Sequence, residues 1–153
     1  MAPDLDTAIA QLAGPRQVVV QEVRRLAREA NFRDKVVRAY DHRCAVTGIQ
    51  LRLIDAAHIL PVGAPGSVDS VQNGLCLSPT YHRAFDHGLI YLDERLVMRL
   101  SQHKVTALRA LGQVGGLDSF QAPLGNLIFL PPDAAQRPTR DIIRRANQFR
   151  RIA

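Results

Sequence analysis

Residues 55–88 constrain the fold more than any other part of the chain, because three short blocks follow one another there in a definite order. The run D-A-A-H-I-L-P contains His58, and the run N-G-L-C-L contains Asn73. The run Y-H-R-A-F-D-H-G then places His82 four residues before Asp86. Residues i and i+4 lie on one face of a helix, so the last run predicts an imidazole and a carboxylate side by side.

The residues around these blocks predict a strand hairpin, a loop and a short helix. Apolar runs on either side of a turn at Gly48 indicate two strands, over residues 44–50 and 51–59. Residues 62–72 are rich in Gly, Ser and polar residues and are expected to form a loop. The helix is expected over residues 79–87. This order is that of a ββα unit.

The rest of the chain predicts further helices and a second hairpin. On the N-terminal side we expect helices over 4–13, 16–30 and 32–41, the last capped by Asn31. On the C-terminal side we expect a hairpin over 89–100, a weak helix over 102–112, a short strand over 126–132 and a helix over 139–151. The elements together indicate an α+β domain over 32–153, with its core at about 43–100 and a helical extension over 1–31.

The composition is that of a folded, basic domain. Of the 153 residues 46% are hydrophobic, and no apolar run approaches the roughly 20 residues that cross a bilayer. The net charge of +6 fits a polyanionic partner, most simply a nucleic acid, although a generic basic protein can have the same charge. The first residues lack the basic and apolar segments of a secretion signal. We therefore expect a soluble, cytoplasmic protein without a membrane partner.

The ordered blocks resemble the HNH endonuclease family, whose members have the ββα-metal fold. The branch that they resemble most occurs in restriction-type nucleases and has the pattern A-A-H-I-x-P, then N-G-L-x-L, then H-R-x-F-D-x-G. A further block, C-A-V-T-G, precedes them at residues 44–48, and the resemblance covers roughly residues 32–100. A lone His-Asn-His order would be a weak signal, whereas four blocks at suitable spacing are specific.

The resemblance implies an enzyme that hydrolyses DNA phosphodiester bonds and leaves 5′-phosphate and 3′-hydroxyl ends. His58 would be the general base, because a neutral imidazole can take a proton from water. His82 and Asp86 would bind one divalent ion that stabilises the 3′ leaving oxygen. Mg²⁺ or Mn²⁺ suits such a mixed pair best, and Ni²⁺ or Zn²⁺ could also bind. Asn73 would pin the loop and help to orient the base.

The chain departs from the wider family at the residue before the base. Many members have a metal-ligating Asp or His there, whereas this chain has Ala57. Strand alternation places Asp55 on the same face as Ala57, which makes Asp55 a weaker candidate for a metal ligand. Asp55 could equally be a surface carboxylate.

A second departure concerns the structural zinc that many members bind through two C-x-x-C pairs. The corresponding positions are Cys44, Thr47, Ser78 and Tyr81. Only one of the four is cysteine, so we expect no structural zinc. Packing of the surrounding apolar side chains would have to replace it.

Arginines near the blocks are candidates for contacts with DNA phosphates, since the guanidinium fork suits phosphate geometry. These candidates are Arg33, Arg43, Arg83, Arg140 and Arg144. Each of them could instead be a solvated surface charge.

Two other functions fit the same motifs. One is a DNA-binding module of this fold that has lost catalysis, which Ala57 suggests. The other is a nuclease toxin kept silent by an immunity protein, which would have the same site. Residues 1–31 fit either a linker from a separate DNA-recognition domain or subunit, or an arm that forms a homodimer.

Overall fold

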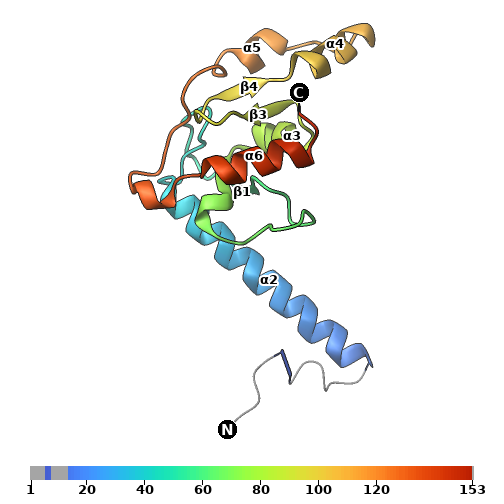
Figure 1. Cartoon of the computed structure of the whole chain (residues 1–153), viewed down its shortest axis with the longest axis vertical. Helices are drawn as coiled ribbons and strands as arrows, with labels where there is room; N and C mark the ends of the chain where they lie inside the picture. The colour runs from blue at the N-terminus through green and yellow to red at the C-terminus, as the bar shows by residue number, and fades with distance from the viewer. Residues whose placement is uncertain (1–5, 8–13, 153) are drawn as a thin grey trace.

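The computed structural model describes residues 6–7 and 14–152, and it has helices packed around two small antiparallel sheets (Figure 1). The first described long element is the helix α2 (Gly14–Ala39). The others, in chain order, are β1 (Asp55–His58), η1 (Val71–Asn73), β2 (Gly74–Leu77), α3 (Pro79–Asp86), β3 (Ile90–Leu92), β4 (Met98–Leu100), α4 (Gln102–Ala110), α5 (Leu117–Gln121), η2 (Ala134–Gln136) and α6 (Arg140–Phe149). This mixture confirms the α+β class.

Helix α2 is continuous where the sequence predicted two helices with a cap at Asn31, so that prediction was wrong. No Gly or Pro interrupts the helix after Pro15, and a single Asn in a helix interior costs little. The helix ends where Asp41 and His42 adopt left-handed backbone angles and the His42 amide caps the Val37 carbonyl at 2.8 Å. The expected boundary between residues 31 and 32 falls inside α2. The helix expected over 4–13 lies outside the described residues, apart from residues 6–7, which are helical.

The first half of α2 extends away from the body of the molecule (Figure 1). Its apolar side chains Val19, Val23 and Leu26 are 61%, 61% and 51% exposed. Burial begins only at Phe32, in the second half of the helix. The helical spacing of apolar residues therefore predicted correctly that this segment is helical. It did not determine which turns of the helix are buried. No helix among the described residues is both long and apolar enough to cross a membrane.

The central hairpin pairs β1 with β2, with Asp55 opposite Leu77 and His58 opposite Gly74. The predicted pairing of residues 44–50 with 51–59 was therefore wrong. Residues 45–47 form a turn. Further along the same segment, Leu51 and Arg52 have φ angles of 53° and 57°, which lie outside the range of a β-strand. The strand that bears His58 is consequently only four residues long.

The elements that follow β2 largely agree with the sequence predictions. The helix expected at 79–87 is α3, the second hairpin is β3 with β4, and the later helices are α4 and α6. The strand expected at 126–132 was wrong, since Leu127 forms a single bridge with Val97 and prolines follow at 131 and 132. Helix α5 was not predicted.

The core forms where the end of α2, the first hairpin and α3 meet. Its fully buried side chains include Val36, Ile59, Leu75 and Phe85. Gly74 lets α2 and β2 approach closely, because a Cβ atom added there would lie 2.3 Å from Cγ2 of Val36. This close packing holds β1 and α3, which bear the candidate site, against each other.

We expect Gly74→Ala to lower the free energy of unfolding by about 1–3 kcal/mol, because the added methyl group overpacks this contact. Gly63→Ala is the matched control, since a Cβ atom there would meet no atom within 4 Å. Urea unfolding followed by circular dichroism measures both changes. Equal stability of the two variants would contradict the role given to Gly74.

Candidate active site

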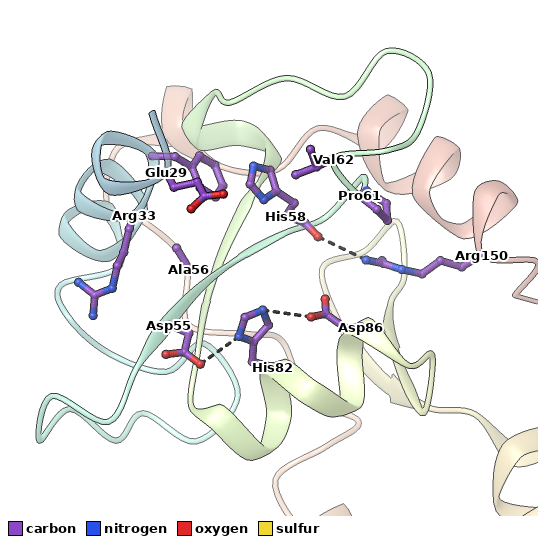
Figure 2. Close-up of a pocket in the computed structure, with 11 residues that line it drawn as sticks. Glu29, Arg33, Asp55, Ala56, His58, Pro61, Val62, His82, Asp86 and Arg150 are labelled. Carbon is purple, nitrogen blue, oxygen red and sulfur yellow. Dashed lines mark hydrogen bonds and ion pairs between the residues drawn. The ribbon is translucent and has the colours of Figure 1, made fainter. Parts of the chain in front are cut away.

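A pocket of about 620 Å³ brings together residues from four parts of the chain (Figure 2). Strand β1 contributes Asp55 and His58, and α3 contributes His82 and Asp86. Arg150, the residue that follows α6, reaches the pocket from the C-terminal side. Further walls come from the second half of α2 and from Pro61 and Val62, which follow β1. The three predicted residues of the hydrolytic site, His58, His82 and Asp86, therefore share one pocket.

His82 lies between two carboxylates. Its Nδ1 atom is 3.0 Å from Oδ2 of Asp55, and its Nε2 atom is 3.2 Å from Oδ2 of Asp86 (Figure 2). The hydrogen bond with Asp86 is the main reason why the pKa of His82 rises to about 9; burial opposes the rise and Asp55 adds to it. Without a metal ion, His82 is therefore a cation at neutral pH that bridges the two acids.

Asp86 and Arg150 complete the charge balance of this side of the pocket. Burial alone would raise the pKa of Asp86, but the hydrogen bond from His82 and the charges of His82, Arg150 and His87 bring it below its usual value. Burial lowers the pKa of Arg150, and Asp86 opposes that shift. Arg150 also donates to the carbonyl of His58 at 3.3 Å and stacks over the Phe85 ring at 4.3 Å.

The raised pKa of His82 predicts how the metal-free protein responds to pH. A group whose pKa is higher in the folded state than in the unfolded state stabilises the fold below the unfolded value and loses that effect as pH rises through the folded value. We therefore expect the melting temperature in EDTA to fall between about pH 6.5 and 9. Thermal melts across this range test it, with His82→Ala as the comparison. A decline of the same size in His82→Ala would show that other groups cause it.

His58 is held by a ring on one side and a carboxylate on the other. Its imidazole stacks on the ring of Phe32 with the centroids 3.9 Å apart and the planes 10° from parallel. Its Nε2 atom is 3.0 Å from Oδ1 of Asp69, in the loop between β1 and β2. The side chain of His58 is 18% exposed. When Nε2–H donates to Asp69, Nδ1 keeps its lone pair and is the ring nitrogen that can accept a proton.

Asn73 is fully buried, and its side chain binds the backbone of the same loop. Its Oδ1 atom accepts from the Leu60 amide at 2.8 Å. Its Nδ2 atom donates to the carbonyls of Leu60 and Val68 at 3.1 and 2.8 Å. These bonds tie both ends of the loop together, and Asp69 directly follows the anchored Val68. Asn73 thus contacts the loop that positions His58, as the resemblance implies.

Two residues of the pocket region were not among the sequence candidates. Asp69 lies in a segment of loop composition, and nothing in its local pattern distinguishes it from a solvated acid. Arg150 is 92 positions from His58 in the chain, within an Arg-rich C-terminal segment. The packing of α6 against β3 brings Arg150 to the site (Figure 1).

The predicted phosphate-binding arginines are dispersed over the molecule. Arg33 lines the pocket, where it also donates to the Ile54 carbonyl at 3.2 Å. The other four do not line it. Arg43 donates to the Gly48 carbonyl at 2.9 Å, and Arg144 pairs with Glu94 at 2.8 Å. Arg83 lines a groove beside α4 and α5. Arg140 is exposed at the start of α6. Their contact with DNA stays a prediction.

The donor atoms of the pocket suit a single, open divalent-metal site. Among residues 6–7 and 14–152, no group of three or more His, Cys, Asp or Glu side chains is arranged to hold a metal ion. The candidate metal donors are therefore two, Nε2 of His82 and the carboxylate of Asp86. The carboxylate of Asp55 contacts the other ring nitrogen of His82, Nδ1. A carboxylate on the second nitrogen of a metal-binding histidine typically orients the ring. Two protein donors leave positions for water and phosphate, which suits Mg²⁺ or Mn²⁺.

The four positions at which relatives bind a structural zinc are used here for hydrogen bonds and packing. The Cys44 thiol accepts from the Thr47 amide at 3.5 Å and lies 3.8 Å from the Ser78 hydroxyl. Tyr81 stacks on Phe120 at 4.9 Å and donates to its carbonyl at 2.8 Å. These contacts join the turn after α2 to the start of α3 and the start of α3 to α5.

Comparison with known proteins shows which family and which fold the chain resembles. Residues 44–93 match the family model of HNH endonucleases, which confirms the predicted resemblance to that family. A solved structure titled a modification-dependent TagI restriction endonuclease has a similar fold, with a TM-score of 0.51 and 24% sequence identity. The likeness covers 78% of this chain but 37% of the other chain, so the chain spans well under half of that protein. No curated protein matches the chain.

Both similar proteins are nucleases: the matched family is that of HNH endonucleases, and the solved structure is titled a restriction endonuclease. HNH nucleases generally use a divalent metal ion, which agrees with the donor pair in the pocket. The restriction endonuclease fold is consistent with the ββα-metal core, here formed by β1, β2 and α3.

Proposed function

We propose that the chain is a metal-dependent endonuclease that hydrolyses DNA phosphodiester bonds in a restriction or defence system. The observation that carries the proposal is the convergence of His58 with the His82–Asp86 pair in one pocket, inside the segment that matches the HNH family. A general base and a metal-binding pair on facing elements are what water attack on a phosphodiester needs.

Each residue has a role that follows from its contacts. His58 takes the proton of the attacking water through the ring nitrogen that Asp69 leaves free. Asp86 and Nε2 of His82 would hold the divalent ion, and Asp55 would orient the His82 ring from the other side. When bound, the ion supplies charge stabilisation for the phosphate and the 3′ leaving oxygen. Arg150 faces the same pocket and offers a guanidinium to the phosphate. The products would have 5′-phosphate and 3′-hydroxyl ends.

The test is incubation of the purified protein with supercoiled plasmid, with EDTA or with Mg²⁺, Mn²⁺ or Ni²⁺. Nicking that depends on the metal supports the proposal. Tight DNA binding without nicking under any metal would instead support a binding module that has lost catalysis. Growth arrest on expression, relieved by a neighbouring acidic protein, would favour a toxin with an immunity partner.

The similarity to a modification-dependent enzyme suggests a further arm of that test. We propose that recognition of a sequence or a modified base, if present, resides in a separate domain or subunit, because the fold likeness covers only part of the other protein. Parallel assays on methylated and unmethylated plasmid measure this. Equal cleavage of both would indicate that this chain cuts without reading the modification.

We expect Asp69→Asn to lower the rate constant for nicking by about tenfold, less than the 10²–10⁴-fold contribution of a general base itself. Asparagine can present its amide instead of a carboxylate to Nε2, so the favourable His58 tautomer is no longer enforced. Single-turnover rates and metal affinity should be measured together. A loss of metal affinity, or no change in rate, would contradict the orienting role of Asp69.

A further inference from the structure

A second pocket, of about 590 Å³, adjoins the candidate active site. Asp86 and Arg150 line both pockets, so the two hollows meet at these side chains. The second pocket is formed by the end of α3, the start of α4 and the residues that follow α6. Arg150, which directly follows α6, reaches α3 and lies over the ring of Phe85. The basic side chains that line the second pocket are His87, His103, Lys104, Arg150 and Arg151.

Two of these side chains, Lys104 and Arg151, have no acidic partner among the described residues. Asp86 is the only acid among the described residues that line the pocket, and it belongs to the proposed metal site. On α6, by contrast, Arg144 and Arg145 are both paired with acids. The pocket therefore concentrates positive charge beside the candidate active site.

The stability of α4 does not account for its basic residues. Acidic residues in the first turn of a helix interact favourably with its dipole, and cations there are unfavourable. Helix α4 has no acid in its first turn, where His103 and Lys104 lie. Lys104 extends towards Gly88, its Cε atom 3.9 Å from the position of a Cβ atom on that glycine. Its charge is thus directed to the pocket side of α4.

We propose that this second pocket binds a backbone phosphate of the DNA strand that is cut, next to the scissile phosphate, with Lys104 and Arg151 as its main contacts. The inference rests on the proposed function, because its ligand is the DNA of that reaction. A DNA strand whose scissile phosphate lies in the first pocket has to continue past Arg150. The neighbouring phosphates of that strand are then partly removed from solvent, and nearby cations stabilise their negative charge. The second pocket supplies those cations at the point where the two hollows meet.

The first test compares two double variants that remove equal charge. Lys104→Gln with Arg151→Gln alters the pocket. Lys35→Gln with Arg109→Gln alters exposed cations that line neither pocket. Both are made in the His58→Ala background, and binding of a fluorescent 30-base-pair duplex is measured by anisotropy from about 50 to 200 mM KCl in Mg²⁺. Circular dichroism checks that each variant is folded.

Each lost phosphate contact lowers the slope of log affinity against log salt by about 0.9. We therefore expect the slope of the pocket variant to fall by about 1–2 and its affinity near 0.1 M salt to fall at least about tenfold. The control variant should keep the slope of its parent. Equal changes in both variants, or no change in the pocket variant, would overturn the inference.

A second test uses the fact that the chain has only two lysines, Lys35 and Lys104, both exposed. The protein is acetylated with an N-hydroxysuccinimide ester, with and without the duplex, and peptides are quantified by mass spectrometry. DNA should protect Lys104 several-fold and leave Lys35 unchanged. Equal reactivity of Lys104 with and without DNA would overturn the inference.

Plasmid nicking by the wild-type protein separates this inference from the proposed function. If the protein nicks plasmid but Lys104 stays reactive, the nuclease stands and the phosphate site fails. If DNA protects Lys104 and the salt slope falls as expected but no metal supports nicking, the phosphate site stands and the proposed catalysis fails.

Discussion

Replacement of His58 by alanine is expected to lower the rate constant for plasmid nicking by about 10²–10⁴-fold, the usual contribution of a general base. The proposed proton acceptor is then absent, whereas His82, Asp86 and Arg150 remain in the pocket. Metal affinity should change little, since His58 has no contact with the His82–Asp86 pair. Single-turnover nicking with saturating Mg²⁺ or Mn²⁺, together with calorimetric metal titration, measures both properties.

Two controls keep the His58 result interpretable. His58→Ala also removes the stacking on Phe32, so His58→Gln, which keeps more of the side chain, should show the same loss of rate with a smaller change in melting temperature. His42→Asn alters an exposed histidine that lines neither pocket, and asparagine tolerates the left-handed backbone there. Nicking by His58→Gln at the wild-type rate would reject His58 as the base.

The second large effect is expected at the metal-binding pair. His82→Ala and Asp86→Asn should each weaken Mn²⁺ binding by more than about 100-fold, because loss of an outer-shell partner alone costs about 10–100-fold. Both should also abolish metal-dependent nicking, because the ion is proposed to stabilise the leaving oxygen. Calorimetric titration with Mn²⁺ and the plasmid assay measure the two effects separately.

The same experiment tests whether Asp55 orients His82 or binds the metal ion directly. Its carboxylate contacts Nδ1 of His82, on the side away from Asp86, so Asp55→Asn should weaken Mn²⁺ binding by only about 10–100-fold. Asp141→Asn is the control, since Asp141 is exposed and pairs with Arg145 on α6. A loss at Asp55 as large as that at Asp86 would make Asp55 a ligand.

Much of the site was predictable because its residues lie within single elements or at short spacing. The i and i+4 spacing of His82 and Asp86 predicts a shared helix face, and α3 has that geometry. The order of the blocks also led to the HNH family, which the match over residues 44–93 confirms. The positions of β3, β4 and α6 followed from local periodicity and turn residues.

The remaining features depended on contacts between distant residues. β1 pairs with β2 rather than with the segment before it. Residues 51 and 52 are not extended, so the preceding segment cannot continue as a strand, and the loop after His58 brings β2 back alongside β1. The continuous α2 and the exposure of its first half were likewise missed, since periodicity shows which side chains share a face but not whether another element covers that face.

The sequence by itself determined the residue types of the candidate site, namely two histidines, an aspartate and an asparagine in an order that resembles a nuclease family. Only the tertiary structure decided which other charges reach that site. Asp69 contacts His58 because Asn73 holds the loop closed, and Arg150 reaches the site because α6 packs against β3. The physical reason is that local spacing sets the direction of side chains within one element, whereas packing of the core sets which elements become neighbours.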